Sequence, residues 1–525
     1  MRKIIYKLMI ISLVLLTGSC TKSWLEISEE GLIPKEDFYK TNEDNIMALA
    51  AVYDMIQVLN AQDWSSLYHI KTVLSDEARA GGNDEGDQPE YHEFDDLKFT
   101  PNNTKINDIW TRLYYAVFRA NVVLENVGEA PNSDVVKAEA YALRAYLYFE
   151  LVNLFDEVPL VLTELLPDEY YMEASSVEAI YAQIEADLQM AIDGLPEKAD
   201  QEDWRIAKGF ANAMMGKVLI FQNKHSEAIP FLEAVSGYAL GSDFEDVLKI
   251  PSEYGPESVF EIGYVNSEGW NWGNYNIWGK GREQENNIHW ILCGPREGFY
   301  TDYDTTHVDG ERPGIQLGVF QGWGALPPTK KMYDLFDVND PRRKSTLLDE
   351  VELADPMYNV SLRARKEIND KPENIPTGSL QHEGAGVLRL KYGTWASEGG
   401  QGSGDEPGLN MGTNLRIMRY AEVLLLKAEA YVVAGGGDPA VPIQELRTRA
   451  GFTTPVGTVD MDVIEKERIA ELSYEGHRFY DLIRWGKGSE LDREGVTFTE
   501  KYSKLPIPQP ELQANPNLMQ NKYWK

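Results

Sequence analysis

The stretch IEKERIAELSYEGHRFYDLIRWG, residues 464–486, decides how this chain folds. Its glutamates Glu467, Glu471 and Glu475 recur every four residues, which places them on one face of a helix. Arg468 and Arg478 lie close to them in the sequence. A catalytic carboxylate cluster is one interpretation of this face. We favour the other, in which internal ion pairs hold helix against helix, so the stretch predicts part of a helical scaffold.

Pairs of helices are predicted on both sides of the middle of the chain. Residues 207–222 and 226–235 form one pair, and residues 419–434 and 439–449 form another. Small residues such as Gly216 allow the two helices of a pair to approach closely, as in a tetratricopeptide-like hairpin. We therefore expect a mainly α fold, with a tetratricopeptide-like helical-hairpin scaffold, a long irregular loop-rich insert and a few short strands.

Two smaller signals add to this expected fold. Ser175 and Glu178 form a capping box ahead of a helix that contains Ile180. Short apolar runs at residues 258–264 and 387–392 are expected to be strands.

The insert, residues 251–415, contains four tryptophans within twenty-one residues, interrupted by glycine and asparagine. No helical periodicity survives there, and a long loop in a compact protein is usually functional. The C–H faces of sugars lie on aromatic rings, while amide side chains bond the hydroxyls. We favour a ligand platform built from Trp270, Trp272, Tyr275 and Trp278, and we expect Trp290, beside apolar neighbours, to be core. The alternative is that these rings fill a gap between helical layers.

Other candidate ligand residues lie outside this cluster. Trp323 stands in the sequence Gln-Gly-Trp-Gly, shortly before a helix start near Pro328. Arg79, which precedes a Gly-Gly pair, and Asn102 carry groups that bond sugar hydroxyls. For Arg79 and Asn102 the alternative is an ordinary turn.

Composition limits the class of ligand. The 525 residues include 84 acidic and 50 basic side chains, which gives a formal net charge of −34. A negative charge of this size repels nucleic acid and anionic lipid surfaces, so the expected ligand is neutral or weakly charged. The hydrophobic content of 43% permits a large core, which excludes wholesale disorder.

The first residues resemble an export signal. Arg2 and Lys3 precede an apolar run that is too short to span a bilayer, and small residues then lead to Cys20. This pattern is similar to a bacterial lipoprotein cleavage site, with residues 1–19 as the signal peptide. Cys20 would then carry acyl chains and anchor the protein. The alternative is an ordinary secretory peptide with an incidental cysteine.

An ordered series of motifs covers nearly the whole mature chain. They are WTRLYYAVFRAN (residues 110–121), AEAYALRAYLYFELVNLFDEVPL (138–160), RYAEVLLLKAEAY (419–431), the opening stretch (464–486) and LPIPQPELQANPNLMQN (505–521). Together they resemble the SusD/RagB family of Bacteroidetes outer-membrane lipoproteins. Asp156-Glu157 stands where that family often has Gly-Asp.

The resemblance implies a surface-exposed, lipid-anchored protein that binds glycan and is not an enzyme. It would deliver oligosaccharide or polysaccharide to a SusC-like TonB-dependent transporter, and no cofactor is implied. Residues 20–250, 251–415 and 416–525 would be the helical N-terminal region, the ligand-face insert and the C-terminal region of one intertwined body. The loop before the Trp110 helix carries Tyr91, Phe94 and Phe99 but no tryptophan, which departs from the family pattern.

Other functions stay open at this point. A glycoside hydrolase needs a carboxylate pair, and five acidic residues lie near the aromatic loop: Glu268, Glu283, Glu285, Asp302 and Asp304. No zinc, phosphate-loop or nucleophile-elbow motif is present. Peptide import within the same family and an adhesive lipoprotein without cargo are further alternatives.

A calcium site is a separate possibility at a cluster of oxygen ligands shortly after Arg79. The cluster is Asn83, Asp84, Glu85 and Asp87. It lacks the helix–loop–helix pattern of calcium loops, so we favour a solvated acidic turn.

Overall fold

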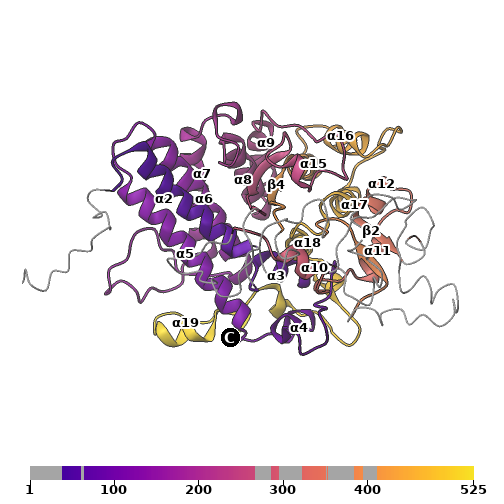
Figure 1. Ribbon diagram of the computed structural model, residues 1–525, viewed down its shortest axis with the longest axis horizontal. Coiled ribbons are helices and arrows are strands. Elements are labelled where there is room, and N and C mark those ends of the chain that lie inside the picture. Colours follow the sequence, from indigo (N-terminus) through magenta and orange to yellow (C-terminus); the bar gives the residue numbers. More distant parts are fainter. Residues whose placement is uncertain are drawn as a thin grey trace, which may run out of the picture.

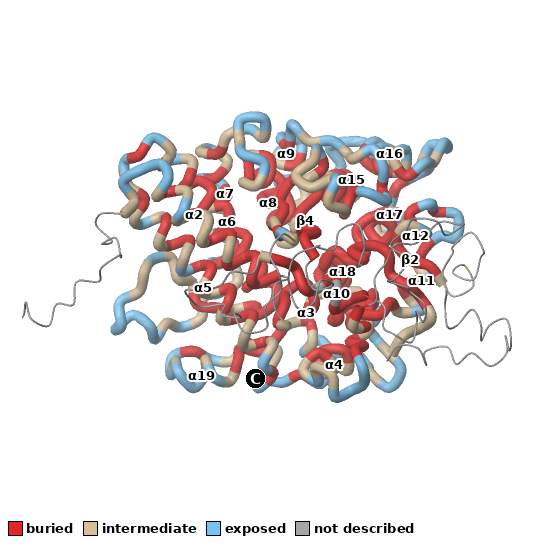
Figure 2. Tube along the Cα trace, viewed as in Figure 1, coloured by how far each residue is buried: buried red, intermediate tan, exposed pale blue. Residues whose placement is uncertain are grey.

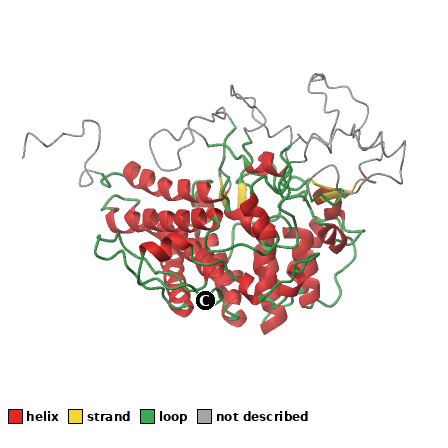
Figure 3. Ribbon diagram, turned by 90° about the horizontal axis from the view of Figure 1, so that it is seen from below, coloured by secondary structure: helices red, strands yellow, loops and turns green. Residues whose placement is uncertain are grey.

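The computed structural model describes residues 38–60, 64–266, 285–294, 322–349, 352, 383–393 and 411–525. Several predicted functional residues lie outside these ranges: Cys20, Trp270, Trp272, Tyr275 and Trp278. Helices form most of the described chain, and the short strands lie toward one edge of it (Figures 1 and 3). Within the described ranges, no helix has the length and apolarity that a membrane crossing requires.

Four long helices form one end of the molecule: α2 (Asn42–Asn60), α5 (Thr104–Asn126), α6 (Ser133–Phe155) and α7 (Val177–Gly194) (Figure 1). Helix α6 packs against both α5 and α7, and α2 packs against α5 and α6. Because α6 is enclosed by neighbours, its residues are buried on every side along its second half (Figure 2).

The two predicted helix pairs are confirmed. They are α8 (Lys208–Phe221) with α9 (His225–Glu233), and α15 (Tyr420–Ala434) with α16 (Ala440–Arg449). Gly216 allows α8 to approach α9 closely, since a Cβ there would lie 2.5 Å from the Leu232 side chain. Helix α9 also packs against α15, so the two pairs, distant in sequence, form one continuous helical layer.

The remaining helices are short and lie between these layers or on their edges. They are α3 (Leu67–Val73), α4 (Pro89–Asp95), α10 (His289–Cys293), α11 (Lys330–Leu335), α12 (Pro341–Thr346), α17 (Met461–Leu472), α18 (Arg478–Arg484) and α19 (Gln509–Ala514).

Both expected strands are present, and each has one antiparallel partner. Strand β1 (Ser258–Ile262) pairs with β4 (Leu415–Arg419), and β2 (Leu347–Asp349) pairs with β3 (Val387–Arg389). The capping box was assigned one residue too early. Ser176 is the N-cap of α7, and its hydroxyl accepts the Ala179 N–H. The Ser175 N–H instead donates to the Val158 carbonyl in an isolated bridge.

The glutamates of the opening stretch form internal ion pairs, as predicted. Glu471 contacts Arg419 at 3.1 Å and Arg342 at 3.2 Å, and it also pairs with Arg449. Glu475 lies 2.7 Å from Arg419. Glu475 is also 2.6 Å from Lys391. Burial alone would raise the pKa of Glu475. The positive charges of the neighbouring Arg419 and Lys391 have the larger effect, and they lower this pKa to about 2. These carboxylates therefore join helices and strands rather than line a cleft.

Trp290 is core, as predicted. Its side chain is fully buried and stacks on Tyr392 with ring centroids 4.2 Å apart. The indole N–H donates to the Thr413 carbonyl at 2.9 Å. This tryptophan therefore joins α10 to the segment before β4 and offers no ligand surface.

Candidate functional site

Two segments far apart in the sequence pair beside α3 and α4. Residues 77–82 run antiparallel to residues 324–329, and we call this unit the paired strap. The Arg79 N–H donates to the Pro327 carbonyl at 3.0 Å, and the Gly82 N–H donates to the Gly324 carbonyl at 2.8 Å. The strap therefore brings Arg79 and the segment of Trp323, two separately predicted site residues, to the same place.

Gly81 makes this close pairing possible. Its φ of +70° lies in the left-handed region that glycine favours. A Cβ at this position would lie 2.3 Å from the Gly324 carbonyl oxygen. Any larger residue would push the two segments of the strap apart.

Trp323, at the start of the second strap segment, stacks on Trp64. Their ring centroids are 5.3 Å apart and their planes are 8° from parallel. Trp64 precedes α3, and its carbonyl accepts a hydrogen bond from the Tyr91 hydroxyl at 2.9 Å. Both rings are half-buried. The pair is thus held by Tyr91 through the Trp64 carbonyl and by the strap segment that follows Trp323.

The side chain of Arg79, in the first segment of the strap, is held by two carboxylates. Its Nε lies 3.0 Å from Asp95, and its Nη2 lies 2.9 Å from Glu383, with a quarter of the side chain exposed. Glu383 Oε2 accepts the Gly81 N–H at 3.1 Å, and His92 Nδ1 lies 3.6 Å from the same oxygen. The guanidinium is therefore fixed in one orientation, as a planar donor group must be for directional recognition.

The electrostatics of Glu383 follow from these contacts. Burial raises the pKa of this carboxyl. The hydrogen bonds from Arg79 and from the Gly81 N–H, with the charge of Arg79, lower it below its ordinary value. Glu383 is thus an ionised anchor for Arg79 and the strap.

Sequence reasoning missed Trp64. It lies in a polar segment just before Ser66, the N-cap of α3, and that setting resembles the one that singled out Trp323. The three aromatics of the loop before α5 are instead buried: Tyr91, Phe94 and Phe99. Tyr91 stacks on His69 with centroids 3.8 Å apart, so it supports α3 from within the core.

Asn102 is not joined to this site by any contact that the described residues show. It is exposed in the turn before α5, where its N–H donates to the Thr100 hydroxyl at 3.3 Å. Asn103, its buried neighbour, caps α5 instead. Asn102 thus stays a separate prediction, and its surroundings are those of an ordinary turn.

The acidic turn after Gly82 is tied by its own hydrogen bonds. Asp84 accepts the Gly86 N–H at 2.8 Å, and Asp87 accepts the Asn83 N–H at 2.9 Å. In the part of the chain that the structure describes, no three acidic, histidine or cysteine side chains are grouped to hold a metal ion. Asp84 and Asp87 therefore each accept a backbone N–H within this turn.

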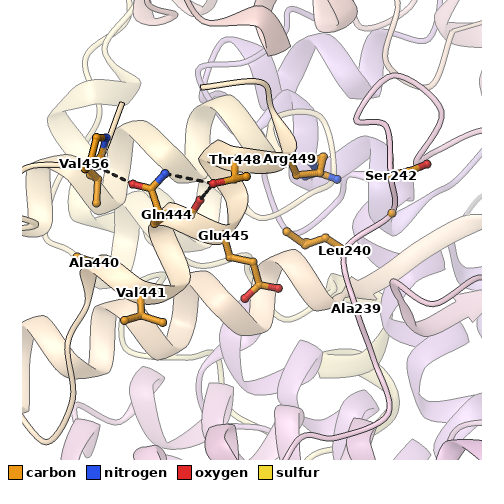
Figure 4. A pocket seen from close by; sticks show the side chains of 12 residues that line it. Ala239, Leu240, Ser242, Ala440, Val441, Gln444, Glu445, Thr448, Arg449 and Val456 are labelled. Atoms are coloured by element: carbon orange, nitrogen blue, oxygen red, sulfur yellow. Dashed lines mark hydrogen bonds between the residues drawn. The ribbon is translucent and has the colours of Figure 1, made fainter. Parts of the chain in front are cut away.

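Another hollow, of about 810 Å³, lies between α16 and residues 239–242 (Figure 4). Leu240, Val441 and Val456 line it, and no aromatic ring does. Its Gln444 is already engaged, because the side-chain oxygen accepts the Val456 N–H at 2.7 Å. The hollow offers no flat surface for a sugar ring, so the Trp64–Trp323 pair is the better candidate site.

Comparisons with known proteins cover almost the whole chain. Residues 256–524 match the family model described as the SusD family. Residues 36–220 match the model described as "Starch-binding associating with outer membrane". A SusD-like protein of Formosa agariphila is 26% identical over 98% of this chain and 99% of its own length.

Solved structures are similar over the same extent. A "Laminarin binding SusD-like protein" is 30% identical, with a TM-score of 0.77, and the match covers 92% of this chain and 100% of that one. Surface glycan-binding protein A of Bacteroides thetaiotaomicron, solved in complex with laminarihexaose, shares the fold. Its TM-score is 0.74 at 23% identity, with 92% and 100% of the two chains covered.

Proposed function

The chain belongs to the SusD family, and from this premise we propose that it is a glycan-binding protein of the cell surface. It captures oligosaccharide or polysaccharide and is a binder rather than an enzyme. The observation that carries the proposal is the stacked Trp64–Trp323 pair, together with the oriented guanidinium of Arg79 on the strap segment that pairs with residues 324–329. Flat aromatic surface with a few fixed polar groups is what a sugar site requires.

Charge supports a neutral glycan as the ligand. The net charge of −34 disfavours a polyanion, and the two carboxylates at Arg79 already balance its positive charge. Each ring contributes roughly 1 kcal/mol beyond its buried area, by analogy with aromatic pairs. Two rings and a few hydrogen bonds give an expected Kd in the micromolar-to-millimolar range, about −4 to −8 kcal/mol. Weak capture suits a protein that hands its ligand on.

The laminarin-binding relative makes a neutral β-glucan the first ligand to test. Starch is the second, from the family description. The other aromatic residues of the insert, Trp270, Trp272, Tyr275 and Trp278, extend the same proposal, because they belong to the same insert as Trp323.

The place of the protein in the cell belongs to this proposal. Cys20 becomes the acylated first residue, and the protein is anchored in the outer membrane facing outward. A SusC-like TonB-dependent transporter receives the glycan. Metabolic labelling with a palmitate analogue tests the anchor, since Cys20→Ala would remove the label. Co-purification of the transporter with a tagged, acylated chain tests the partner.

The decisive experiment is native affinity electrophoresis of the mature chain lacking Cys20. The gels contain laminarin, starch or another neutral polysaccharide, with a polyanionic polymer as the contrast. The Trp64→Ala/Trp323→Ala double variant is run in parallel, with Met190→Ala/Val338→Ala as its control. The control residues are exposed and lie on other elements, at 52% and 74%.

We expect one neutral polymer to retard the wild type and the control pair, and to retard the Trp64→Ala/Trp323→Ala variant much less. Unchanged retardation of the tryptophan variant would leave glycan binding in place but move the site to the aromatic cluster of Trp270, Trp272, Tyr275 and Trp278. Retardation by no polymer, together with binding of peptides, would replace the glycan by peptide cargo.

A further inference from the structure

Helix α5 carries a stripe of aromatic rings that runs from the core to the surface. Trp110, Tyr114 and Phe118 recur every four residues, and Tyr115 lies beside them. Trp110 is buried in the core, Tyr114 and Tyr115 are half-buried against it, and Phe118 is exposed. The outer end of this stripe therefore has apolar surface that the packing of α5 does not cover.

These rings form one wall of a groove of about 560 Å³, which we call the α5–α19 groove. Residues 159–172 and α19 with the residues after it form the other walls. Two amides fix these walls together: Asn515 Nδ2 donates to the Met172 carbonyl at 2.7 Å, and Asn517 Nδ2 donates to the Tyr171 carbonyl at 2.7 Å. The groove is therefore a preformed hollow with its own hydrogen-bonded frame.

Several rings in this groove are open to solvent. Phe118 is 42% exposed, Tyr170 is 57% exposed and Tyr171 is 55% exposed. Leu166, at 62%, adjoins them in the same loop. Exposed apolar side chains gathered on one surface mark a binding site more often than isolated ones do.

The polar groups of the groove suit a neutral, hydroxyl-bearing ligand. Glu511 is the one charged side chain among its lining residues, and burial raises its pKa above the ordinary value. The Tyr114 hydroxyl donates to the Pro159 carbonyl at 2.8 Å, which holds that ring upright in the wall. The hydroxyls of Tyr170 and Tyr171 add donors and acceptors at the rim.

The size of the groove favours a short stretch of a linear polymer over a protein surface. Its volume lies within the roughly 300 to 1,000 Å³ typical of small-molecule pockets. A stable protein interface needs about 800 Å² from each partner and is mostly flat. A concave hollow with aromatic walls, tyrosine hydroxyls and a single carboxylate matches a neutral glycan segment better.

We propose that the α5–α19 groove is a second glycan subsite, which holds the same polymer away from the Trp64–Trp323 pair. The proposal rests on the proposed glycan-binding function. The two sites share no lining residue, because the groove is built by α5, residues 159–172 and α19. Engagement of one chain at two places raises the apparent affinity for long polymers without any new contact at either site.

The test compares two double variants on laminarin, on starch and on any panel polymer that retards the wild type. Phe118→Ala/Tyr170→Ala removes two exposed rings of the groove, and Trp64→Ala/Trp323→Ala removes the first site. Met190→Ala/Val338→Ala is the control for loss of exposed apolar surface. Far-UV circular dichroism and Tm verify that each variant is folded. Titration with laminarihexaose measures binding of a short ligand, for comparison with the polymer.

The groove variant is expected to bind the polymer about fivefold more weakly than the control, with hexasaccharide affinity unchanged within about twofold. The Trp64→Ala/Trp323→Ala variant is expected to keep weak retardation, which the groove substitutions then abolish. Equal polymer binding by the groove variant and the control would overturn the second subsite while leaving the proposed function intact. Complete loss of retardation in the tryptophan variant would also overturn it. Failure of the wild type to bind any neutral polymer would overturn both proposals.

Discussion

Trp64 and Trp323 lie face to face, with ring centroids 5.3 Å apart and ring planes 8° from parallel. Neither residue is near the other in sequence, and neither belongs to a helix or strand. The paired strap brings Trp323 to Trp64, and α3 with Tyr91 holds Trp64 in place. The candidate site therefore depends on backbone pairing between two loops, and its predicted behaviour follows from that dependence.

Trp323→Ala should lower glycan affinity by about tenfold, because it removes one ring and leaves Trp64 without its stacking partner. Isothermal titration with the polymer that retards the wild type measures the change. Trp485→Ala is a matched control. The Arg484 guanidinium lies 4.6 Å from the centroid of the Trp485 ring, and Trp485 is far from the strap in the sequence. Equal losses in both variants would indicate general damage rather than a lost ligand contact.

Gly81→Ala should weaken glycan binding while leaving most of the helical scaffold folded. The added Cβ would lie 2.3 Å from the Gly324 carbonyl oxygen, and the φ of +70° is unfavourable for alanine. Circular dichroism and affinity electrophoresis separate the two effects. Gly457→Ala is the control, since a Cβ there meets no atom within 4 Å. Wild-type affinity in Gly81→Ala would show that the strap does not position the site.

Glu77→Gln should reduce the loss of stability that accompanies a rise in pH from 5 to 8. Burial raises the pKa of Glu77 to about 7, although the Tyr474 N–H bond lowers it in part. The folded state thus binds a proton that the unfolded state, with a pKa near 4.5, has released. Stability contributed in this way is present at low pH and is lost as pH rises through 7.

Urea unfolding of wild type and Glu77→Gln at pH 5 and pH 8 measures this difference. Glutamine keeps an acceptor for the Tyr474 N–H, and Glu43→Gln, at an exposed position on α2, is the control. Identical pH slopes for wild type and Glu77→Gln would contradict the raised pKa.

Glu471→Gln should lower the free energy of unfolding by about 3 to 5 kcal/mol, because it leaves buried arginines without a charge partner. Arg342, Arg419 and Arg449 all contact this carboxylate. Urea unfolding at pH 7 gives the value, and Asp96→Asn is the control. The Asp96–Lys98 pair lies in solvent, which screens it, so its loss should change stability far less.

The same residue predicts acid sensitivity. Burial raises the pKa of Glu471, but Arg449, Arg419 and Arg342 lower it far below its ordinary value. Stability from a lowered carboxyl pKa is present above pH 4.5 and is lost as pH falls further. The stability gap between wild type and Glu471→Gln should therefore narrow below pH 4. A constant gap would mean that the charge of Glu471 contributes nothing.

Asp156→Gly should stabilise the protein by about 1 kcal/mol. Asp156 ends α6 with φ 69° and ψ −110°, a backbone conformation that glycine adopts with much less strain. This is the position where the resembling family often has glycine. Asp156→Ala is the control, because it also removes the 3.3 Å contact with Lys522 but keeps the Cβ. If Asp156→Gly is no more stable than Asp156→Ala in urea unfolding, the strain argument is wrong.

Local patterns predicted the scaffold well. The helix pairs around Gly216 and Gly435, the strands β1 and β3, and the core position of Trp290 follow from local residue patterns within short windows. The one-residue error at Ser175 has the same origin: two adjacent serines carry the same capping signal, and the bridge of Ser175 to Val158 selects Ser176 as the cap.

The candidate site was predicted only in part. Arg79 and Trp323 were singled out from their glycine-flanked settings, but nothing local indicates that they meet. Trp64 was not predicted, because the expected ligand aromatics were those of the loop before α5, and these are buried. Burial of Tyr91, Phe94 and Phe99 depends on α3 and the C-terminal tail, which a window of neighbouring residues does not contain.

The helical hairpins, their glycine ends and the ion-paired face of residues 464–486 can be predicted from the amino-acid sequence, because each depends on residues a few positions apart. Which aromatic residues face solvent depends on tertiary packing. The strap that joins the segment of Arg79 to the segment after Trp323 forms through hydrogen bonds between distant loops. Likewise, the aromatic stripe of α5 runs from core to surface, and the packing of α2 and α6 leaves Phe118 exposed. Local periodicity identifies an apolar face, but only the packed neighbours determine whether that face is core or surface.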